Sequence, residues 1–182
     1  MIPNSLKATD QLHITLGEKV ECIPLCRPLF NSWTGETVDR FGNKDLLLVD
    51  GKPQFAEVAI LRAFENEGWK GRWTEVYGHM HAPAFWREWK AGGPGAQEHI
   101  PIAEAWVNEK LQAIAKANGG NYAGCWDVVA WRGERLVFAE AKLQKKDKMR
   151  DTQFRWLEAA LQCGCAMEDF LVVEWCINEA QE

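Results

Sequence analysis

The sequence predicts an α/β protein, because from residue 53 onward segments with helical periodicity alternate with short apolar runs typical of buried strands. The 182 residues are 47% hydrophobic and 26% charged, the ordinary mixture of a globular protein. No apolar run approaches the roughly 18 residues of a membrane span, and no basic segment leads into an apolar one at the N-terminus. We therefore expect no membrane association, and we interpret the six cysteines as reduced thiols of a cytoplasmic protein.

From residue 53 the expected order is helix, strand, insert with a helix, strand, strand, helix and strand. Apolar residues at helical spacing, followed by glycine stops, predict helices over 53–68, 103–117 and 151–163, the last with Asp151 as its N-cap. Short apolar runs predict strands over 72–77, 125–131, 136–142 and 170–175. We therefore expect a mixed four-stranded sheet flanked by helices, with a helical insert at about 79–118.

The first 52 residues are rich in turn-forming proline, glycine and asparagine. Only short apolar stretches such as 46–49 indicate strands there. We expect residues 1–52 to form an N-terminal extension that packs on a domain made of residues 53–182.

Two of the expected strands are separated by four residues and predict a β-hairpin. If Gly133 and Glu134 form a two-residue turn with glycine first, as a type II′ turn prefers, the pairing register is fixed. Asp127 then lies directly opposite Glu140, and Lys142 shares the face of Glu140 because side chains alternate along a strand. Two opposed carboxylates among apolar neighbours repel each other, so the arrangement indicates either a shared proton or a bound cation.

These residue types suit phosphate chemistry. Mg²⁺ prefers one or two carboxylates completed by water and phosphate oxygens, and an adjacent ammonium stabilises charge that develops in the transition state. A lone Glu-x-Lys tripeptide is common by chance, and an exposed hairpin edge often carries such charges for solubility. The apolar setting, the opposed aspartate and the basic segment that follows favour a phosphoryl-transfer or phosphodiester-hydrolysis site.

At these residues the chain resembles the PD-(D/E)XK nuclease superfamily, whose restriction-endonuclease-like core runs α-β-β-β-α-β. Asp127 and the run Glu140-Ala-Lys142 resemble its active-site motif, with Trp126 in place of the proline in the family's name. The order of elements also fits, over roughly residues 53–176. More narrowly, the Glu-x-Lys strand, a loop with Asp147 and a helix that opens with Gln153 resemble the VRR-NUC branch.

The resemblance implies a role for each matching residue. Asp127 and Glu140 would bind Mg²⁺, with Mn²⁺ as a substitute, helped by the main-chain carbonyl of Ala141. Lys142 would position or activate the attacking water, and Gln153 would orient water or phosphate at the edge of the site. The protein is then expected to be a metal-dependent nuclease, and in particular a DNA endonuclease.

The family's acid on the first helix is the least defined of the implied residues. Glu57 is the best match, and Glu65 and Glu67 are its rivals.

Basic residues are concentrated between Lys142 and Arg155, where six of them stand against two acids in a protein of net charge −5. The acidic balance argues against a general nucleic-acid binder, so contact with DNA is expected to be local. The side chains expected to contact phosphates are Lys145, Lys146, Lys148, Arg150 and Arg155. A homodimer would place two active sites on opposite strands.

Other interpretations stay open at this point. A module that binds nucleic acid without cleaving it, or a metal-dependent phosphatase, would share much of the pattern. A zinc site built from His79, His81, Cys22 and Cys26 is disfavoured, because no Cys-x-x-Cys pair exists. The run from Trp86 to Lys90 is interpreted as a packing turn rather than a platform for unpaired bases.

Overall fold

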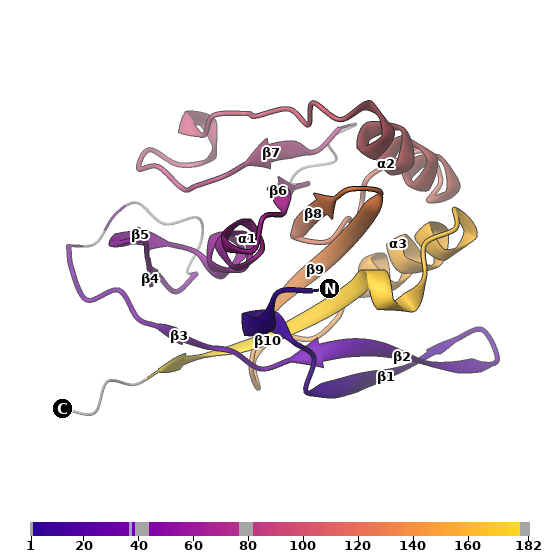
Figure 1. Cartoon of the computed structure of the whole chain (residues 1–182), viewed down its shortest axis with the longest axis horizontal. Coiled ribbons are helices and arrows are strands. Elements are labelled where there is room, and N and C mark those ends of the chain that lie inside the picture. The colour runs from indigo at the N-terminus through magenta and orange to yellow at the C-terminus, as the bar shows by residue number, and fades with distance from the viewer. Residues whose placement is uncertain (1, 37, 39–43, 77–81, 179–182) are drawn as a thin grey trace.

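The computed structural model describes residues 2–36, 38, 44–76 and 82–178, which form an α/β protein (Figure 1). Its helices are α1 (Ala56–Asn66), α2 (Ala105–Ala117) and α3 (Asp151–Gln162). A mixed, open sheet of eight strands contains β1 (Asp10–Leu16), β2 (Lys19–Cys26), β3 (Leu29–Asn31), β6 (Lys70–Glu75), β7 (Ala84–Trp86), β8 (Val128–Arg132), β9 (Arg135–Leu143) and β10 (Phe170–Asn178). A separate small hairpin is formed by β4 (Leu47–Val49) and β5 (Lys52–Gln54).

The four strands that the sequence predicts lie next to one another at the centre of this sheet. The strand order is β1-β2-β10-β9-β8-β6-β7, with β3 pairing farther along β10. Strand β9 runs parallel to β10 and antiparallel to β8, which is antiparallel to β6. The expected four-stranded sheet is thereby corrected to eight strands. The N-terminal segment adds β2 and β3, which cover the otherwise open edge of β10, and β1, which pairs with β2. The insert adds β7.

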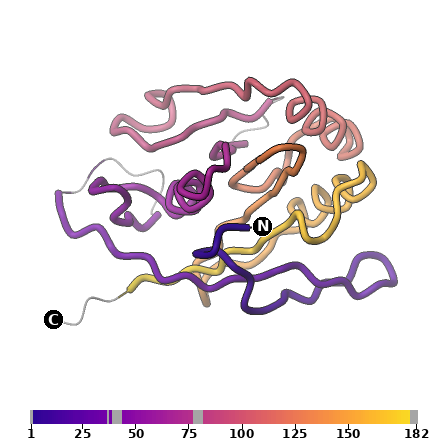
Figure 2. The backbone as a smooth tube through the Cα atoms, in the orientation of Figure 1, coloured from indigo at the N-terminus to yellow at the C-terminus, as the bar shows by residue number. Residues whose placement is uncertain are grey.

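Side chains of the central strands alternate between two helical layers, as the period of a strand requires. Val128 packs in a buried cluster with Phe64 of α1. The next residue, Val129, packs in a second cluster with Leu111 of α2 and Trp156 of α3. Helices α2 and α3 lie side by side, and the sheet separates them from α1 (Figures 1 and 2). The core is therefore a sheet between helices on both faces.

The glycines predicted to end α1 and α3 are confirmed. The predicted start of α1 and the predicted N-cap of α3 are corrected. Gly68 and Gly164 follow α1 and α3 with φ of 78° and 82°, a conformation that glycine adopts at little cost. Helix α1 begins after Pro53, which instead pairs within β5. The N-cap of α3 is the extended residue Arg150, and Asp151 is the first residue of the helix.

The remaining expectations concern shorter segments and the chain's environment. The strand expected over 46–49 is confirmed as β4, and the one expected over 72–77 is β6, although its last residue lies outside the described residues. None of the described helices is long and apolar enough to span a bilayer. The six cysteines are free thiols.

Candidate active site

The β8–β9 hairpin brings the two expected carboxylates together. Its ladder pairs Val128 with Ala139, which is the expected register, and Gly133 adopts the positive φ of 62° that a type II′ turn needs at its first position. Asp127 lies one residue before β8. Its main-chain N–H donates to Glu140 Oε2 at 3.2 Å, so the two carboxylate residues are adjacent across the end of the hairpin.

The end of the β8 ladder leaves part of β9 facing the site. The main-chain N–H of Ala141 donates to Asp127 Oδ2 at 3.0 Å instead of to a strand carbonyl. In a strand the N–H and C=O of one residue point to the same edge. The Ala141 carbonyl therefore faces the same gap, where it is available as the third metal ligand that the family resemblance implies.

Lys142 and Gln153 meet at Glu140. The ammonium of Lys142 lies 2.9 Å from Glu140 Oε1 and donates to Gln153 Oε1 at 3.1 Å. The amide of Gln153 donates to the same oxygen of Glu140, and all three residues are buried. Gln153 Oε1 also accepts the main-chain N–H of Arg150 at 2.8 Å. Gln153 thus ties the start of α3 to the acid and the lysine of β9.

The segment before Asp127 is held directly against α3. Gly124 has a φ of 83°, and a Cβ built there would lie 2.0 Å from the main-chain oxygen of Thr152. The indole Nε1 of Trp126 donates to the main-chain oxygen of Gln153 at 3.3 Å. Only glycine allows this approach of two backbones, which fixes Asp127 relative to Gln153.

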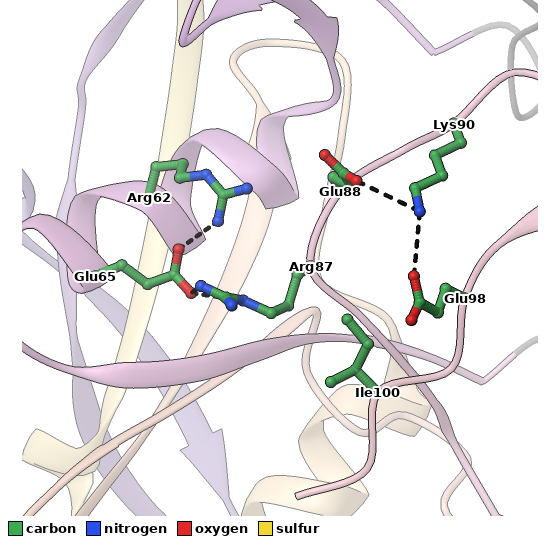
Figure 3. A pocket seen from close by; sticks show the side chains of 7 residues that line it. All are labelled: Arg62, Glu65, Arg87, Glu88, Lys90, Glu98 and Ile100. Atoms are coloured by element: carbon green, nitrogen blue, oxygen red, sulfur yellow. Dashed lines mark hydrogen bonds and ion pairs between the residues drawn. The ribbon is translucent and has the colours of Figure 1, made fainter.

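Of the three candidate acids near the first helix, only Glu57 lies at the site. It is buried in the first turn of α1 and lines the cavity that Asp127 and Glu140 also line. Glu65 points to a different, charged pocket, where it pairs with two arginines (Figure 3). Glu67 accepts the main-chain N–H of Asn4.

The cavity also contains three charged residues that the sequence analysis missed, namely Lys44, Asp45 and Glu75. Glu75 lies at the end of β6, and Lys44 lies just before β4 and bonds to Glu57. The position of Glu75 follows from the pairing of β6 with β8, since Trp73 pairs with Val128 and the next residues of β6 run past Asp127. That pairing was the missing signal for Glu75. Lys44 lies in a loop, where no periodicity marks a functional side chain.

Burial raises the pKa of three acids in the cavity, namely Asp127, Glu140 and Glu75. Burial and the neighbouring Glu57 raise the pKa of Asp127, and burial and Asp127 raise that of Glu140 well above its ordinary range. Burial raises the pKa of Glu75 to about 7. Carboxylates kept in such a setting are typical of sites where a cation or a proton is handled.

Basic side chains lie around the opening of the cavity, whose volume is about 890 Å³. Lys146, Lys148 and Arg150 line it and are exposed, and the exposed Asp147 lies among them, so the buried acids lie below a rim in which bases outnumber acids. Lys145 and Arg155 are exposed too, but they do not line the cavity. The structure therefore divides the five expected phosphate contacts into three at the cavity and two outside it.

The donor set suits a hard divalent ion. Within the described ranges, no three His, Cys, Asp or Glu side chains are grouped as a metal site, so a closed structural zinc centre finds no support there. Mg²⁺ needs only one or two carboxylates, with a carbonyl and water completing its shell. Those oxygens can come from Asp127, Glu140 and the Ala141 carbonyl. A bound cation would also reduce the repulsion between the two carboxylates.

The structure also bears on the packing turn and on the zinc site that the sequence analysis considered. Trp86 and Trp89 are buried against Phe55 and Trp73, which confirms the packing interpretation of that segment. Of the four residues considered for zinc, the two histidines lie outside the described residues. Cys26 is buried, and burial raises its pKa to about 12, which disfavours the thiolate that zinc requires.

Compared with known proteins, the chain matches no family model, no curated protein and no solved structure. The functional argument consequently depends on the geometry of this cavity and on the motif residues that line it.

Proposed function

We propose that the protein is a Mg²⁺-dependent nuclease that hydrolyses phosphodiester bonds, with DNA as its expected substrate. The observation that carries the proposal is the adjacency of Asp127, Glu140 and Lys142 at the closed end of a cavity whose rim is basic. The arrangement of β6, β8, β9, α3 and β10 around these residues also follows the order that the resemblance to PD-(D/E)XK nucleases implies.

The divalent ion, when bound, polarises the phosphate and lowers the pKa of water. Asp127, Glu140 and the carbonyl of Ala141 hold it. Lys142 lies against Glu140 with its ammonium buried, so it is placed to orient water and to stabilise charge on the phosphate. Gln153 holds both side chains in position through its amide.

The basic rim favours a polymeric substrate over a small phosphate ester. Lys146, Lys148 and Arg150 are exposed at the opening, beyond the buried acids. Several cations spread along an opening suit successive phosphates of a nucleic-acid backbone, since each contact releases counterions and adds to affinity. A phosphatase for small substrates needs no such extended rim.

The experiment is a cleavage assay on linear, nicked, flapped and four-way DNA, with Mg²⁺ and with EDTA. We expect Mg²⁺-dependent cleavage of at least one of these substrates and a loss of about a thousandfold or more in Glu140→Gln. The matched control is Glu98→Gln, because Glu98 is an exposed acid of the other charged pocket. Absence of cleavage, together with hydrolysis of small phosphate esters, would indicate the phosphatase. Tight DNA binding without cleavage would indicate a binding module.

A further inference from the structure

The acids of the cavity already have one cation within the protein. The Lys44 ammonium bonds to Glu57, whose side chain is 6% exposed, while the lysine side chain is 41% exposed. Glu57, Asp127 and Glu75 together outweigh the effect of burial and raise the pKa of Lys44 to about 12. Lys44 is therefore charged at neutral pH.

Aromatic rings fix the side chain of Lys44 in this place. Its Nζ lies 5.6 Å from the ring centroid of Trp73 and 5.8 Å from that of Phe55. Both rings belong to a buried cluster, and their faces attract a cation. The ammonium is thus held on one side by ring faces and on the other by carboxylates.

Two-metal phosphoryl-transfer sites place a second ion about 3.5–4 Å from the first, usually with a carboxylate shared between them. Here Glu57 and Glu75 are the acids that could hold a second ion beside Asp127, and Glu57 is already bonded to Lys44. An ammonium and a divalent ion in the same place would repel each other strongly.

We propose that the Lys44 ammonium occupies the second cation position, so that the site binds one divalent ion, at Asp127 and Glu140, and Glu57 holds the lysine rather than the metal. This inference rests on the proposed function, since it concerns the same metal site. It assigns a role to Lys44 in the N-terminal segment and gives Glu57 a role other than metal ligand.

The test counts Mn²⁺ ions bound to the full chain without nucleic acid, by titration calorimetry and by electron paramagnetic resonance. We expect one ion in the wild type and two in Lys44→Met, the second lost again in Lys44→Met/Glu57→Gln. Lys52→Met is the matched control, because Lys52 is an exposed lysine outside the cavity, and it should bind one ion. Two ions in the wild type, or one in folded Lys44→Met, would overturn the inference.

A second variant decides the question even where Lys44→Met does not fold. Glu57→Gln in the otherwise unchanged chain should bind one Mn²⁺ with an affinity within about threefold of the wild type, because Glu57 is not a ligand. Loss of that ion would overturn the inference while leaving the nuclease proposal standing. A wild type that binds no Mn²⁺ at all would instead contradict the proposed function itself.

Discussion

Two cavities in this protein are lined by charged side chains, and the two differ in how acids and bases are arranged. In the pocket beside α1, Glu65 pairs with Arg62 and Arg87, and Lys90 lies 3.1 Å from Glu98 (Figure 3). In the cavity at the ends of β8 and β9, several buried acids lie together and share two lysines, because Lys142 lies against Glu140 and Lys44 bonds to Glu57. Three more exposed bases line the rim.

This difference indicates which of the two cavities is the better candidate for a functional site. Exposed ion pairs such as Lys90 with Glu98 contribute little to stability and are common on any protein surface. The half-buried Glu65 is neutralised by two arginines. Buried acids whose pKa values are raised by burial and by one another cost stability unless a ligand or proton neutralises them. The second cavity therefore carries an energetic cost that the proposed cation would relieve, and the first does not. Arg87 and Lys90 in the first pocket are paired with acids, so they are weaker candidates for contact with DNA than the bases at the rim.

The largest effect is expected on DNA affinity when the bases at the rim of the second cavity are removed. Replacing Lys146, Lys148 and Arg150 with alanine should weaken DNA binding by about ten- to a hundredfold at low salt. The slope of log affinity against log salt should become shallower by about 2–3, because each phosphate contact contributes about 0.9. Binding is measured at several salt concentrations in the presence of Mg²⁺, on the background of Glu140→Gln so that cleavage does not interfere.

The matched control for the rim is the double replacement of Lys145 and Arg155 with alanine. These side chains are exposed and basic but do not line the cavity, so the slope should change less than in the triple variant. A larger change in the double variant would place the DNA path away from the cavity.

The next largest effect is expected on the free energy of unfolding, which the buried acids lower in the metal-free protein. Asp127→Asn should raise the free energy of unfolding of the metal-free protein at neutral pH by about 1–2 kcal/mol, because it removes a carboxylate held in a buried, acidic setting. The asparagine oxygen still accepts the N–H of Ala141. The same substitution should weaken the rise in melting temperature that Mn²⁺ gives the wild type. Chemical denaturation and thermal melting, each with and without Mn²⁺, measure both changes.

The control for Asp127 is again Glu98→Gln in the paired pocket. Its effect on unfolding should stay within about 0.5 kcal/mol, as is usual for an exposed ion pair, and its response to Mn²⁺ should match the wild type. If Asp127→Asn behaved in the same way as this control, the two cavities would not differ energetically.

A smaller effect is expected from the pH dependence of Glu75. Its pKa is about 7 in the folded protein against an ordinary value of 4.5, so in this window the folded protein holds more protons than the unfolded one. The contribution of Glu75 to stability is therefore fully present below pH 4.5 and is lost as pH rises through 7. Glu75→Gln should stabilise the metal-free protein at pH 8 and have little effect at pH 4.5. Equal effects at both pH values would contradict the raised pKa.

The parts of this architecture that could be predicted from sequence are those fixed by short-range signals. The Gly133-Glu134 turn and the alternation along the two strands sufficed to place Asp127 opposite Glu140. The main helices and central strands were found in the same way. The N-cap of α3 was misassigned, because an aspartate is the usual cap, whereas here Arg150 has the extended backbone.

What could not be predicted depends on contacts between distant segments. Strands β2 and β3 pair with β10, more than a hundred residues away, and nothing in residues 1–52 marks that partner. Glu75 reaches the site only through the pairing of β6 with β8. Lys44 lies just before β4, and its ammonium lies over the rings of Phe55 and Trp73, which belong to later segments of the chain.

The most direct test of the central claim separates metal binding from cleavage at β9. Lys142→Ala should bind Mn²⁺ with an affinity close to that of the wild type and fail to cleave DNA, because lysine is not a metal ligand. Glu140→Gln should fail in both. Cleavage by Lys142→Ala at near wild-type rate, or unchanged Mn²⁺ affinity in Glu140→Gln, would contradict the assignment of this cavity as a metal-dependent nuclease site.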